Sequence, residues 1–475
     1  MPNRKPRDEA CREALTILRR KLPETCIVEE AGDMRRYEIG ARYGDGSAAF
    51  VLRPSTVEEL RSSISICSQC GVRIVPQGAN TGLVGASTPS EDGDQVVLSL
   101  ERLKQPLVVD ADNRSVTVGA GVRLSELNAA LEAHGLFFPI DLGADPSVGG
   151  MVATNTGGSR FIRYGDVRAN VIGLEVVLAD SDATVLDLAT AVRKNNIGPD
   201  LKQLFVGTGG AFGIVTKAVL NVMPKPAQQV TALLALSGPE SIAKLVPALE
   251  GRFGELLTAV EAMSAAAVNL ALVHRPSLKP PFAPEPMPDE TVLVELSTSL
   301  LPGALNLDAV LEAGLADLFE EGMITNALVG RAEEFWLLRH ALSEGLKAAG
   351  KVVAFDISVP RGAVGTFKRD ATALVGNLLP DAVVADFGHV GDGGLHFNLV
   401  LPATMLDISP VRVQEARQAI YELVHRQGGS FSAEHGVGPY NWTYYEQFRG
   451  PLARSIDGRL ADIFGRILGR LSFKG

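Results

Sequence analysis

Three glycine-rich segments, each beside a strand-like stretch, dominate the amino-terminal half of the chain. They span residues 77–86, 149–158 and 207–216. Glycine lets several backbone N–H groups line one concave turn, which can hold a pyrophosphate without many positive side chains. The spacing of the first segment matches neither the G-x-G-x-x-G fingerprint nor a P-loop. Together the segments favour one long ligand, such as a dinucleotide, over three unrelated tight turns.

A second motif lies in the carboxyl-terminal half, where residues 388–398 read Gly-His-Val-Gly-Asp-Gly-Gly-Leu-His-Phe-Asn. An apolar run precedes it and an alternating strand follows it, so its central glycines predict a tight hairpin loop. With Val390 opposite Leu395, His389 would stand opposite His396.

Cross-strand Cβ atoms on one face are about 4.5–5.5 Å apart, close enough for His389 and His396 to share a metal ion. Asn398 would project from the same face. The alternative interpretation is a glycine-rich hairpin with two hydrogen-bonded histidines and no ligand.

A carboxylate and an imidazole follow near the carboxyl terminus, in the glycine-rich turn Glu434-His435-Gly-Val-Gly. His389, His396 and Glu434 would provide two nitrogen ligands and one oxygen ligand, with coordination positions left for a substrate. His435 would remain available as a base. Three of the chain's seven histidines lie in these two short motifs, which favours chemistry over packing.

The composition is that of an ordinary globular protein, with 46% hydrophobic and 21% charged residues. A net charge of −10 without a long basic run argues against nucleic acid as a partner. No apolar stretch of about 18 residues occurs, so no membrane span is expected. The polar first residues give no signal peptide, and a cytoplasmic location is the default expectation.

Cysteine contributes little to the predicted chemistry. The four cysteines are too few to crosslink a chain of 475 residues, and no run of them could hold an iron–sulfur cluster. Cys67 and Cys70 end an amphipathic stretch, which favours a helix end over a redox or zinc site. Redox chemistry would therefore depend on an organic cofactor or a metal.

The distribution of glycine segments, strand-like stretches and helix-like stretches along the chain predicts an α+β protein of three parts. Residues 1–224 carry the glycine segments, residues 225–428 alternate strands and helices and carry the histidine hairpin, and residues 429–475 return to the first part. A helix predicted over residues 333–349 places Arg339 and Ser343 on one face, because they are four residues apart. From the pattern alone, Arg339 is more readily interpreted as a surface salt-bridge residue.

The glycine segments resemble the FAD-binding domain of the vanillyl-alcohol oxidase (PCMH) type, in which three such segments wrap FAD. The resemblance implies a pyrophosphate loop at Gly78, Asn80, Thr81, Gly82 and Leu83. Thr81 stands where some relatives carry a histidine linked to the flavin, so non-covalent FAD is expected. The full set of expected cofactor-binding residues is Pro76, Gly78, Asn80, Thr81, Gly82, Leu83, Gly150, Thr154, Asn155, Gly157, Gly158, Gly210, Gly213, Ile214 and Val215.

The two histidine motifs resemble the C-terminal domain of FAD-linked D-2-hydroxy acid dehydrogenases, which include D-2-hydroxyglutarate and D-lactate dehydrogenases. The resemblance implies an α+β, ferredoxin-like substrate cap and a C-terminal segment that closes the site. It implies a divalent metal on His389, His396 and Glu434, typically Zn²⁺, with Mn²⁺ or Fe²⁺ as alternatives. It further implies His435 as catalytic base, with Asn398, Arg339 and Ser343 as substrate-binding residues.

One departure bears on the substrate. Dicarboxylate-specific relatives carry a lysine at the position of Ala354, and Lys351, three residues away on a strand, would face the opposite side. D-lactate, D-malate and D-2-hydroxyglutarate therefore stay open as substrates, and 2-hydroxyglutarate is not expected to bind as it does in those relatives.

Three rival functions remain from the sequence: a non-redox FAD enzyme of the ether-lipid synthase type, a flavoprotein subunit of a glycolate-oxidase-like complex, and a pure binding protein. For the dehydrogenase, the electron acceptor is expected to be an electron-transferring flavoprotein or a quinone, with a cytochrome also open. NAD has no visible site. A homodimer is expected because it is common among relatives.

Overall fold

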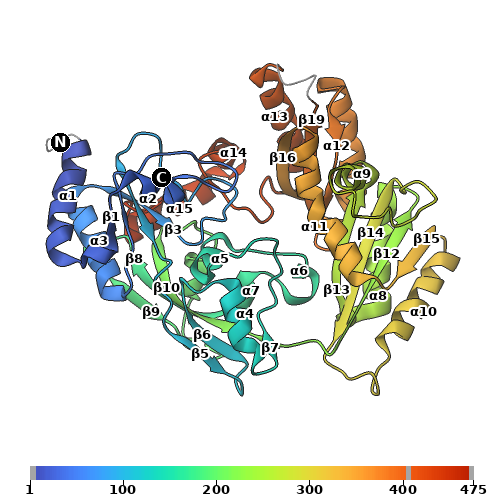
Figure 1. Ribbon diagram of the computed structural model, residues 1–475, viewed down its shortest axis with the longest axis horizontal. Coiled ribbons are helices and arrows are strands. Elements are labelled where there is room, and N and C mark those ends of the chain that lie inside the picture. The colour runs from blue at the N-terminus through green and yellow to red at the C-terminus, as the bar shows by residue number, and fades with distance from the viewer. Residues whose placement is uncertain (1–6, 403–407, 470–475) are drawn as a thin grey trace. The chain divides into compact units, whose positions relative to one another are not determined.

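The computed structural model describes residues 7–402 and 408–469, and the chain divides into two compact units (Figure 1). Unit 1 comprises Met1–Thr156, Asp166–Lys225 and His435–Gly475, and unit 2 comprises Gly157–Gly165 and Pro226–Glu434. The short segment Gly157–Gly165 therefore belongs to unit 2, although both its neighbours in the chain belong to unit 1.

A small sheet of four strands forms the first layer of unit 1. Its order is β1-β2-β4-β3, with strands β1 (Ile27–Val28), β2 (Phe50–Leu52), β3 (Arg73–Gln77) and β4 (Gln95–Ser99). Helices α1 (Arg7–Lys21) and α3 (Val57–Cys70) bury their apolar faces in the same core as this sheet. The hydroxyl of Thr56 accepts from the backbone N–H of Glu59, and Gly71 ends α3 in the left-handed conformation.

An antiparallel sheet of five strands forms the second layer of unit 1, in the order β5-β6-β10-β8-β9. Its core also holds side chains from α4, α5 and the carboxyl-terminal helix α15, whose Phe464 lies 5.1 Å from Phe205 between ring centroids. The bounds are β5 (Leu107–Asp110), β6 (Ser115–Gly119), β8 (Val171–Leu178), β9 (Val185–Leu188), β10 (Gly213–Asn221), α4 (Leu124–Glu132), α5 (Val148–Thr154) and α15 (Pro451–Phe464). Smaller elements are α2 (Ala31–Glu38), α7 (Val167–Asn170), α14 (Trp442–Phe448) and the pair β7 (Leu136–Phe137) and β11 (Met223–Pro224).

Unit 2 is built on one large antiparallel sheet. The order is β15-β12-β14-β13-β18-β19-β16, and β17 also pairs with β19. The strands are β12 (Gln228–Leu236), β13 (Leu257–Ser264), β14 (Glu290–Thr298), β15 (Asn326–Val329), β16 (Lys351–Ser358), β17 (Val383–Val384), β18 (Phe387–Gly388) and β19 (Gly394–Leu401). Strands β13 and β14 are buried along almost their whole length, which fits a sheet covered on both faces.

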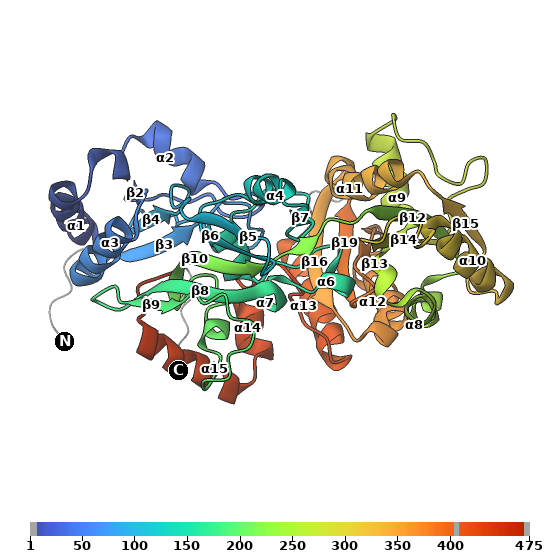
Figure 2. The same cartoon turned by 90° about the horizontal axis from the view of Figure 1, so that it is seen from below.

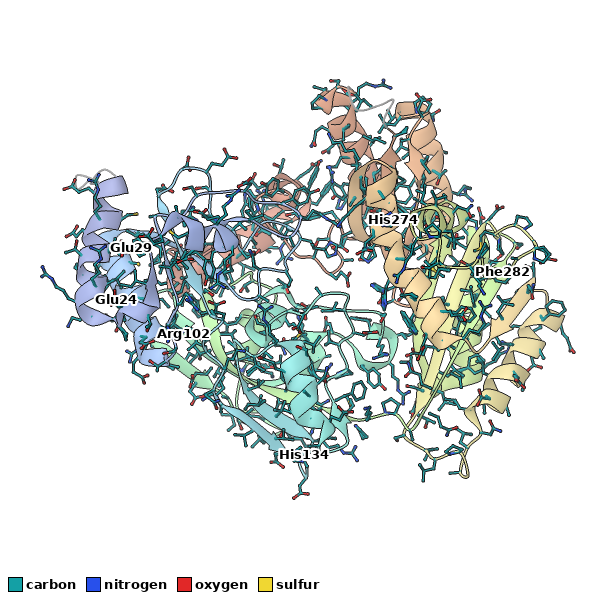
Figure 3. The ribbon with its side chains drawn as sticks, viewed as in Figure 1. Glu24, Glu29, Arg102, His134, His274 and Phe282 are labelled. Carbon is teal, nitrogen blue, oxygen red and sulfur yellow. The ribbon has the colours of Figure 1, made fainter. Side chains whose placement is uncertain are left out.

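Helices cover both faces of this sheet (Figure 2). Helices α9 (Ala265–His274) and α11 (Ala332–Ala349) pack on one face, together with Phe282, a buried residue labelled in Figure 3. Helices α8 (Ile242–Phe253), α10 (Leu307–Glu320), α12 (Val364–Leu378) and α13 (Pro410–Arg426) lie on the other face. The short helix α6 (Phe161–Tyr164) packs against β13. Within the described ranges, no helix combines the length and the apolar character needed to cross a bilayer.

Candidate functional site

The three glycine-rich segments meet in unit 1. A Cβ on Gly78 of the first segment would overlap the hydroxyl of Ser147, next to the second segment. A Cβ on Gly210 of the third segment would lie 3.0 Å from the ring of Pro76. Backbone hydrogen bonds join the third segment to the second, from Gly207 N to Val152 O (3.0 Å) and from Gly209 N to Ala153 O (2.8 Å). We call the place where these three segments meet the cradle. Gly78 and Gly210 leave no room for a side chain there, so the segments approach one another through their backbones.

The glycine content predicted a loop for the second segment, and this prediction is wrong for residues 148–154. Residues 148–154 form helix α5, which begins at Ser147, whose hydroxyl accepts from Gly150 N at 3.3 Å. Gly149 is required because a Cβ there would lie 2.7 Å from the Cβ of Ala120. Its glycines thus allow close packing of a helix on the sheet, and the first N–H groups of α5 bind within unit 1, from Val148 N to Val122 O (2.9 Å) and from Gly149 N to Ala120 O (2.8 Å).

Two amide side chains brace the first segment. Gln77, which is buried, donates to the carbonyl oxygens of Tyr37 (2.8 Å) and Ser87 (2.7 Å). Asn80 adopts a left-handed conformation with φ of 57° and donates to Ile39 O at 2.7 Å. These side-chain hydrogen bonds fix the conformation of the first segment, whose backbone forms part of the cradle.

The remaining predicted cofactor residues divide between the two units. Thr154 and Asn155 end α5, and Asn155 donates to Asp166 Oδ2 at 2.7 Å. Gly157 and Gly158 belong to unit 2, where a Cβ on Gly157 would lie 3.6 Å from Glu434 Oε2. The others lie in unit 1: Pro76, Thr81, Gly82 and Leu83 in and after β3, and Gly210, Gly213, Ile214 and Val215 at the start of β10.

The segment that begins at His435 packs against the first glycine loop of unit 1. A Cβ on Gly438 would overlap Val84 O, and the ring of Tyr440 stacks on that of Tyr43 at 4.8 Å between centroids. Asn441 accepts from Gly438 N (2.7 Å) and donates to Gly436 O (3.0 Å). Asn441 thus fixes the turn that follows His435.

The histidine hairpin of unit 2 forms, but the predicted register is wrong by two residues. His396 stands opposite Phe387, not opposite His389, and His389 begins the turn, where its carbonyl accepts from Gly394 N at 3.1 Å. The turn lies one residue earlier in the chain than predicted, with residues 390–393 between His389 and Gly394, and the carboxylate of Asp392 accepts from Gly394 N at 2.7 Å. A shift of two residues preserves the face, and the two imidazole centroids lie 5.4 Å apart.

Carboxylates gather around these histidines. Glu434 Oε1 lies 3.4 Å from His396 Nε2, and Glu434 Oε2 lies 3.7 Å from His389 Nε2. Asp356 stands opposite His396 in the β16–β19 pair, and its Oδ2 accepts from Glu434 N at 3.1 Å. Asp356, His396 and Glu434 can each offer one ligand atom within 4.8 Å of the others. The donors therefore fit a divalent cation with nitrogen and oxygen ligands.

Two residues of this cluster have no counterpart in the motifs that the sequence pointed to. Asp356 comes from β16, and Glu261 comes from β13, where it is fully buried. Glu261 Oε1 lies 2.5 Å from His389 Nδ1, and Glu261 Oε2 accepts from Arg339 Nε at 2.8 Å. The available signal for Glu261 was a single charged residue inside an otherwise apolar strand.

Burial and charge act against each other in this cluster. Burial by itself lowers the pKa of His389, but the carboxylates of Glu261 and Glu434 raise the pKa well above its usual value. Burial favours a raised pKa for Glu261, yet His389 and Arg339 bring that pKa below its ordinary range. Burial raises the pKa of Asp392 to about 6, against the opposing effect of His389.

The predicted substrate residues differ in their surroundings. Arg339 is buried on α11, pairs with Glu261 and lies over the ring of Phe387 at 4.7 Å, so its interpretation as a surface residue is wrong. Ser343, one turn later, is exposed. Asn398 is buried, and its amide nitrogen donates to Ala385 O (3.3 Å) and His396 O (3.0 Å).

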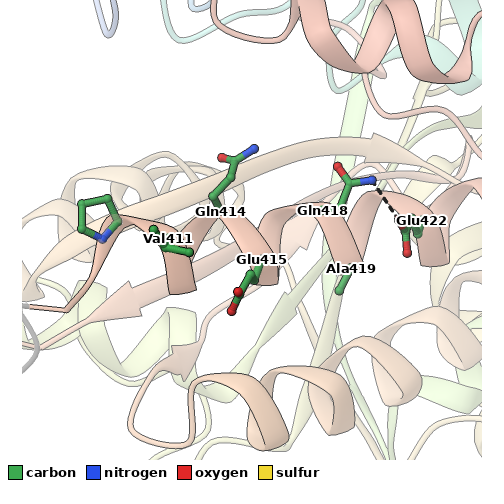
Figure 4. Close-up of a pocket in the computed structure, with 7 residues that line it drawn as sticks. Val411, Gln414, Glu415, Gln418, Ala419 and Glu422 are labelled. Carbon is green, nitrogen blue, oxygen red and sulfur yellow. Dashed lines mark hydrogen bonds between the residues drawn. The ribbon is translucent and has the colours of Figure 1, made fainter.

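A separate hollow lies along α13, and none of the predicted site residues lines it (Figure 4). Polar and apolar side chains of the helix line it, including Val411 and Gln418, which donates to Glu422 at 2.9 Å. No titratable group of the histidine cluster contributes to its lining.

Two family models match the chain. Residues 48–188 match the model described as an FAD binding domain, and residues 225–459 match the model for the C-terminal domain of FAD linked oxidases. The first range contains two of the three glycine segments, and the second contains both histidine motifs.

Relatives cover most of the chain. A D-2-hydroxyglutarate dehydrogenase from Bos taurus is 36% identical over 83% of this chain and 70% of the relative. One from Danio rerio is 32% identical over 94% of this chain and 82% of the relative. One from Xanthomonas citri is 32% identical over 90% of this chain and 89% of the relative.

Solved structures agree on the fold. The chain is similar to p-cresol methylhydroxylase, with a TM-score of 0.73 and 18% identity over 97% of this chain and 95% of that one. It is also similar to alkyldihydroxyacetonephosphate synthase, with a TM-score of 0.68 and 16% identity over 94% of this chain and 84% of that one. These likenesses identify the vanillyl-alcohol oxidase (PCMH) type of fold.

Proposed function

Because the chain belongs to the FAD-linked D-2-hydroxy acid dehydrogenase family and is an FAD-dependent oxidoreductase, we propose that it oxidises a small D-2-hydroxy acid to the 2-oxo acid. The observation that supports this most is the cluster of His389, His396 and Glu434 in unit 2, in a chain whose other unit carries the glycine cradle. Oxidation at C2 removes one hydride and one proton, so the site needs an electron acceptor and a base.

FAD, when bound at the cradle of unit 1, would supply the two-electron acceptor for the hydride that leaves C2 of the substrate. The backbone of the first glycine segment would hold the pyrophosphate, with Gln77 and Asn80 keeping that loop in shape. The absence of a histidine at Thr81 supports non-covalent binding.

A divalent cation, most suitably Zn²⁺, would be held by His389, His396 and Glu434 and would supply Lewis acidity toward the hydroxyl and carboxylate of the substrate. His435 follows Glu434 directly and would take the hydroxyl proton as the C2–H bond breaks. Through the Glu434–His435 peptide bond, the last ligand in unit 2 and the base in unit 1 are covalently adjacent. No cysteine takes part.

The substrate would be fixed by the remaining residues of unit 2. Both amide N–H groups of Asn398 are used by backbone carbonyls, so its side-chain oxygen would accept a hydrogen bond from the substrate. Arg339 would meet the carboxylate through N–H groups other than those held by Glu261, with exposed Ser343 one turn away on α11.

We infer that substrates with a single carboxylate are favoured over D-2-hydroxyglutarate. Several relatives are D-2-hydroxyglutarate dehydrogenases, yet Ala354 provides no cation for a second carboxylate. Lys351, the nearest basic residue of β16, has the opposite orientation in the strand and is exposed. The electron acceptor of the reduced flavin would be an electron-transferring flavoprotein or a quinone.

The test is anaerobic mixing of the purified yellow protein with D-lactate, D-malate, D-2-hydroxyglutarate and their L-enantiomers, with the flavin absorbance followed. Rapid bleaching by a D-hydroxy acid but not by its enantiomer is the expected result. A flavin that no hydroxy acid reduces would contradict the proposal and favour the non-redox alternative. A large preference for D-2-hydroxyglutarate would contradict the inference drawn from Ala354.

A further inference from the structure

Glu261 occupies an unusual place for a carboxylate. It lies in the middle of β13, opposite Leu293 of β14, and its side chain has an exposure of 0%. A buried carboxylate without partners costs several kcal/mol, so its position depends on the groups that it contacts. Those groups are His389 and Arg339.

The two oxygens of Glu261 are divided between these partners. Oε1 lies 2.5 Å from Nδ1 of His389. Oε2 lies 2.8 Å from both Nε and Nη2 of Arg339. One carboxylate on a central strand therefore connects the turn after β18 with helix α11.

The contact with His389 decides which ring nitrogen is available. Because a carboxylate accepts the Nδ1–H bond, the lone pair of the neutral ring is on Nε2, and this atom lies 3.7 Å from Glu434 Oε2. Carboxylate partners of this kind commonly orient the histidine ligands of metals.

The contact with Arg339 fixes the guanidinium plane. Two of its five N–H groups point to Glu261, and the ring of Phe387 lies against it at 4.7 Å. Its remaining N–H groups are thereby held in one orientation at low entropic cost.

We propose that Glu261 is a positioning residue that orients the metal ligand His389 and the substrate-binding Arg339 together. This inference rests on the proposed function, because it assigns a role toward the metal and the substrate. Glu261 does not itself meet the substrate; it acts through its two partners.

The chain provides a matched control in Glu295 on the neighbouring strand β14. Its side chain also has an exposure of 0%, and it also binds an arginine, Arg160, at 3.3 Å. Trp336 of α11 donates to it at 2.9 Å, and Gln229 donates as well. Neither histidine of the cluster is among these partners, so Glu295 reproduces burial and charge but not the contact with His389.

The experiment compares Glu261→Gln with Glu295→Gln in the full FAD-loaded protein. Zn²⁺ retained after dialysis against graded concentrations of a chelator gives the metal affinity, and flavin absorbance and melting temperature report folding. We expect Zn²⁺ affinity to fall about 10–100-fold in Glu261→Gln and to change less than about twofold in Glu295→Gln. With Zn²⁺ saturating, KM for the D-hydroxy acid should still rise in Glu261→Gln through Arg339.

Equal Zn²⁺ retention in wild type and Glu261→Gln, or an equal loss in both variants, would overturn the inference while the proposed function stands. A wild-type protein that binds no Zn²⁺ would overturn both. Should Glu261→Gln fail to fold, Glu261→Asp keeps the charge but withdraws it from His389 and Arg339. Retention of full Zn²⁺ affinity in a folded Glu261→Asp variant would equally contradict the inference.

Discussion

At the residue scale, Ala354 is the position where one side chain should change the choice of substrate. It stands opposite Asn398 in the β16–β19 pair, two residues from Asp356, so its Cβ projects on the face that carries His396. We predict that Ala354→Lys raises kcat/KM for D-2-hydroxyglutarate relative to D-lactate by about 10–100-fold, the value of one charge-assisted hydrogen bond of about 1.5–3 kcal/mol.

Ala354→Met is the control for this substitution, because it adds length without charge. Steady-state comparison of the two substrates with both variants gives the ratio directly. If methionine improves the ratio as much as lysine does, the effect is one of packing, and the charge argument for Ala354 fails.

The sequence pointed to residues that lie in short motifs and not to residues outside them. It predicted His389, His396 and Glu434 as metal ligands because each lies in a short, distinctive glycine-rich stretch. Glu261 was not, since its partner His389 is far away in the chain and no local pattern joins them. Arg339 was placed on the surface for the same reason: its burial depends on Glu261, which the pattern of α11 does not contain.

At the element scale, the turn between β18 and β19 sets the histidine geometry. Gly393 has φ of 93°, and a Cβ there would overlap the carbonyl oxygen of Val359. We predict that Gly393→Ala lowers the free energy of unfolding by more than about 1–2 kcal/mol, because both the backbone conformation and the contact are unfavourable. Zn²⁺ retention should fall with it, since His389 lies in the same turn.

The matched substitution is Gly376→Ala in α12, where a Cβ would meet nothing within 4 Å. Helix propensity predicts a gain of about 0.5–1 kcal/mol there. Thermal and urea unfolding of both variants would decide the matter, and a Gly393→Ala variant as stable as wild type would refute the role assigned to this turn.

A buried ion cluster joins α12 to the sheet of unit 2. Lys368 Nζ lies 2.6 Å from Asp386 Oδ2 and also binds Glu290, and all three side chains are buried. Burial raises the pKa of Glu290 to about 7, although Lys368 opposes the rise. Lys368→Met would leave two carboxylates without their cation, which is expected to cost about 3–5 kcal/mol at pH 8.

This loss should depend on pH with a defined sign. Without Lys368, the folded-state pKa of Glu290 should rise further above its unfolded value of about 4.3, so the folded state binds a proton more tightly. Stability then falls as pH rises through that window and recovers in acid. Urea unfolding at pH 5.5 and 8 should show the smaller loss at pH 5.5.

Lys225→Met serves as the control, because its ion pair with Glu132 is exposed and its loss should change the stability little at either pH. A Lys368→Met variant that loses the same stability at both pH values would show that the cluster acts through packing alone.

The observed bounds of an element lie close to the predicted ones where hydrophobic periodicity and capping residues agree. The predicted helix over residues 333–349 is α11 (Ala332–Ala349). Two expectations were wrong for identifiable reasons. The glycines of α5 allow close packing of a helix on the sheet instead of forming a loop, and the hairpin turn lies one residue earlier than predicted, which shifts the strand pairing by two residues.

At the scale of the whole molecule, each unit has its own hydrophobic core and its own part of the chemistry. Unit 1 carries the residues proposed to bind FAD, and unit 2 carries the donors proposed for the metal. The chain crosses between the units at several points, and the crossing from Glu434 to His435 joins the proposed metal ligand to the proposed base. On this proposal, electron transfer to FAD requires both cofactors.

The most direct measurement is the rate of anaerobic flavin reduction by a D-2-hydroxy acid before and after removal of metal with a chelator. FAD content is held constant and checked by absorbance. We predict rapid reduction in the Zn²⁺-loaded protein, a loss of at least about 100-fold after chelation, and recovery when Zn²⁺ is returned. Reduction at an unchanged rate in protein shown to be metal-free would contradict the proposed role of His389, His396 and Glu434.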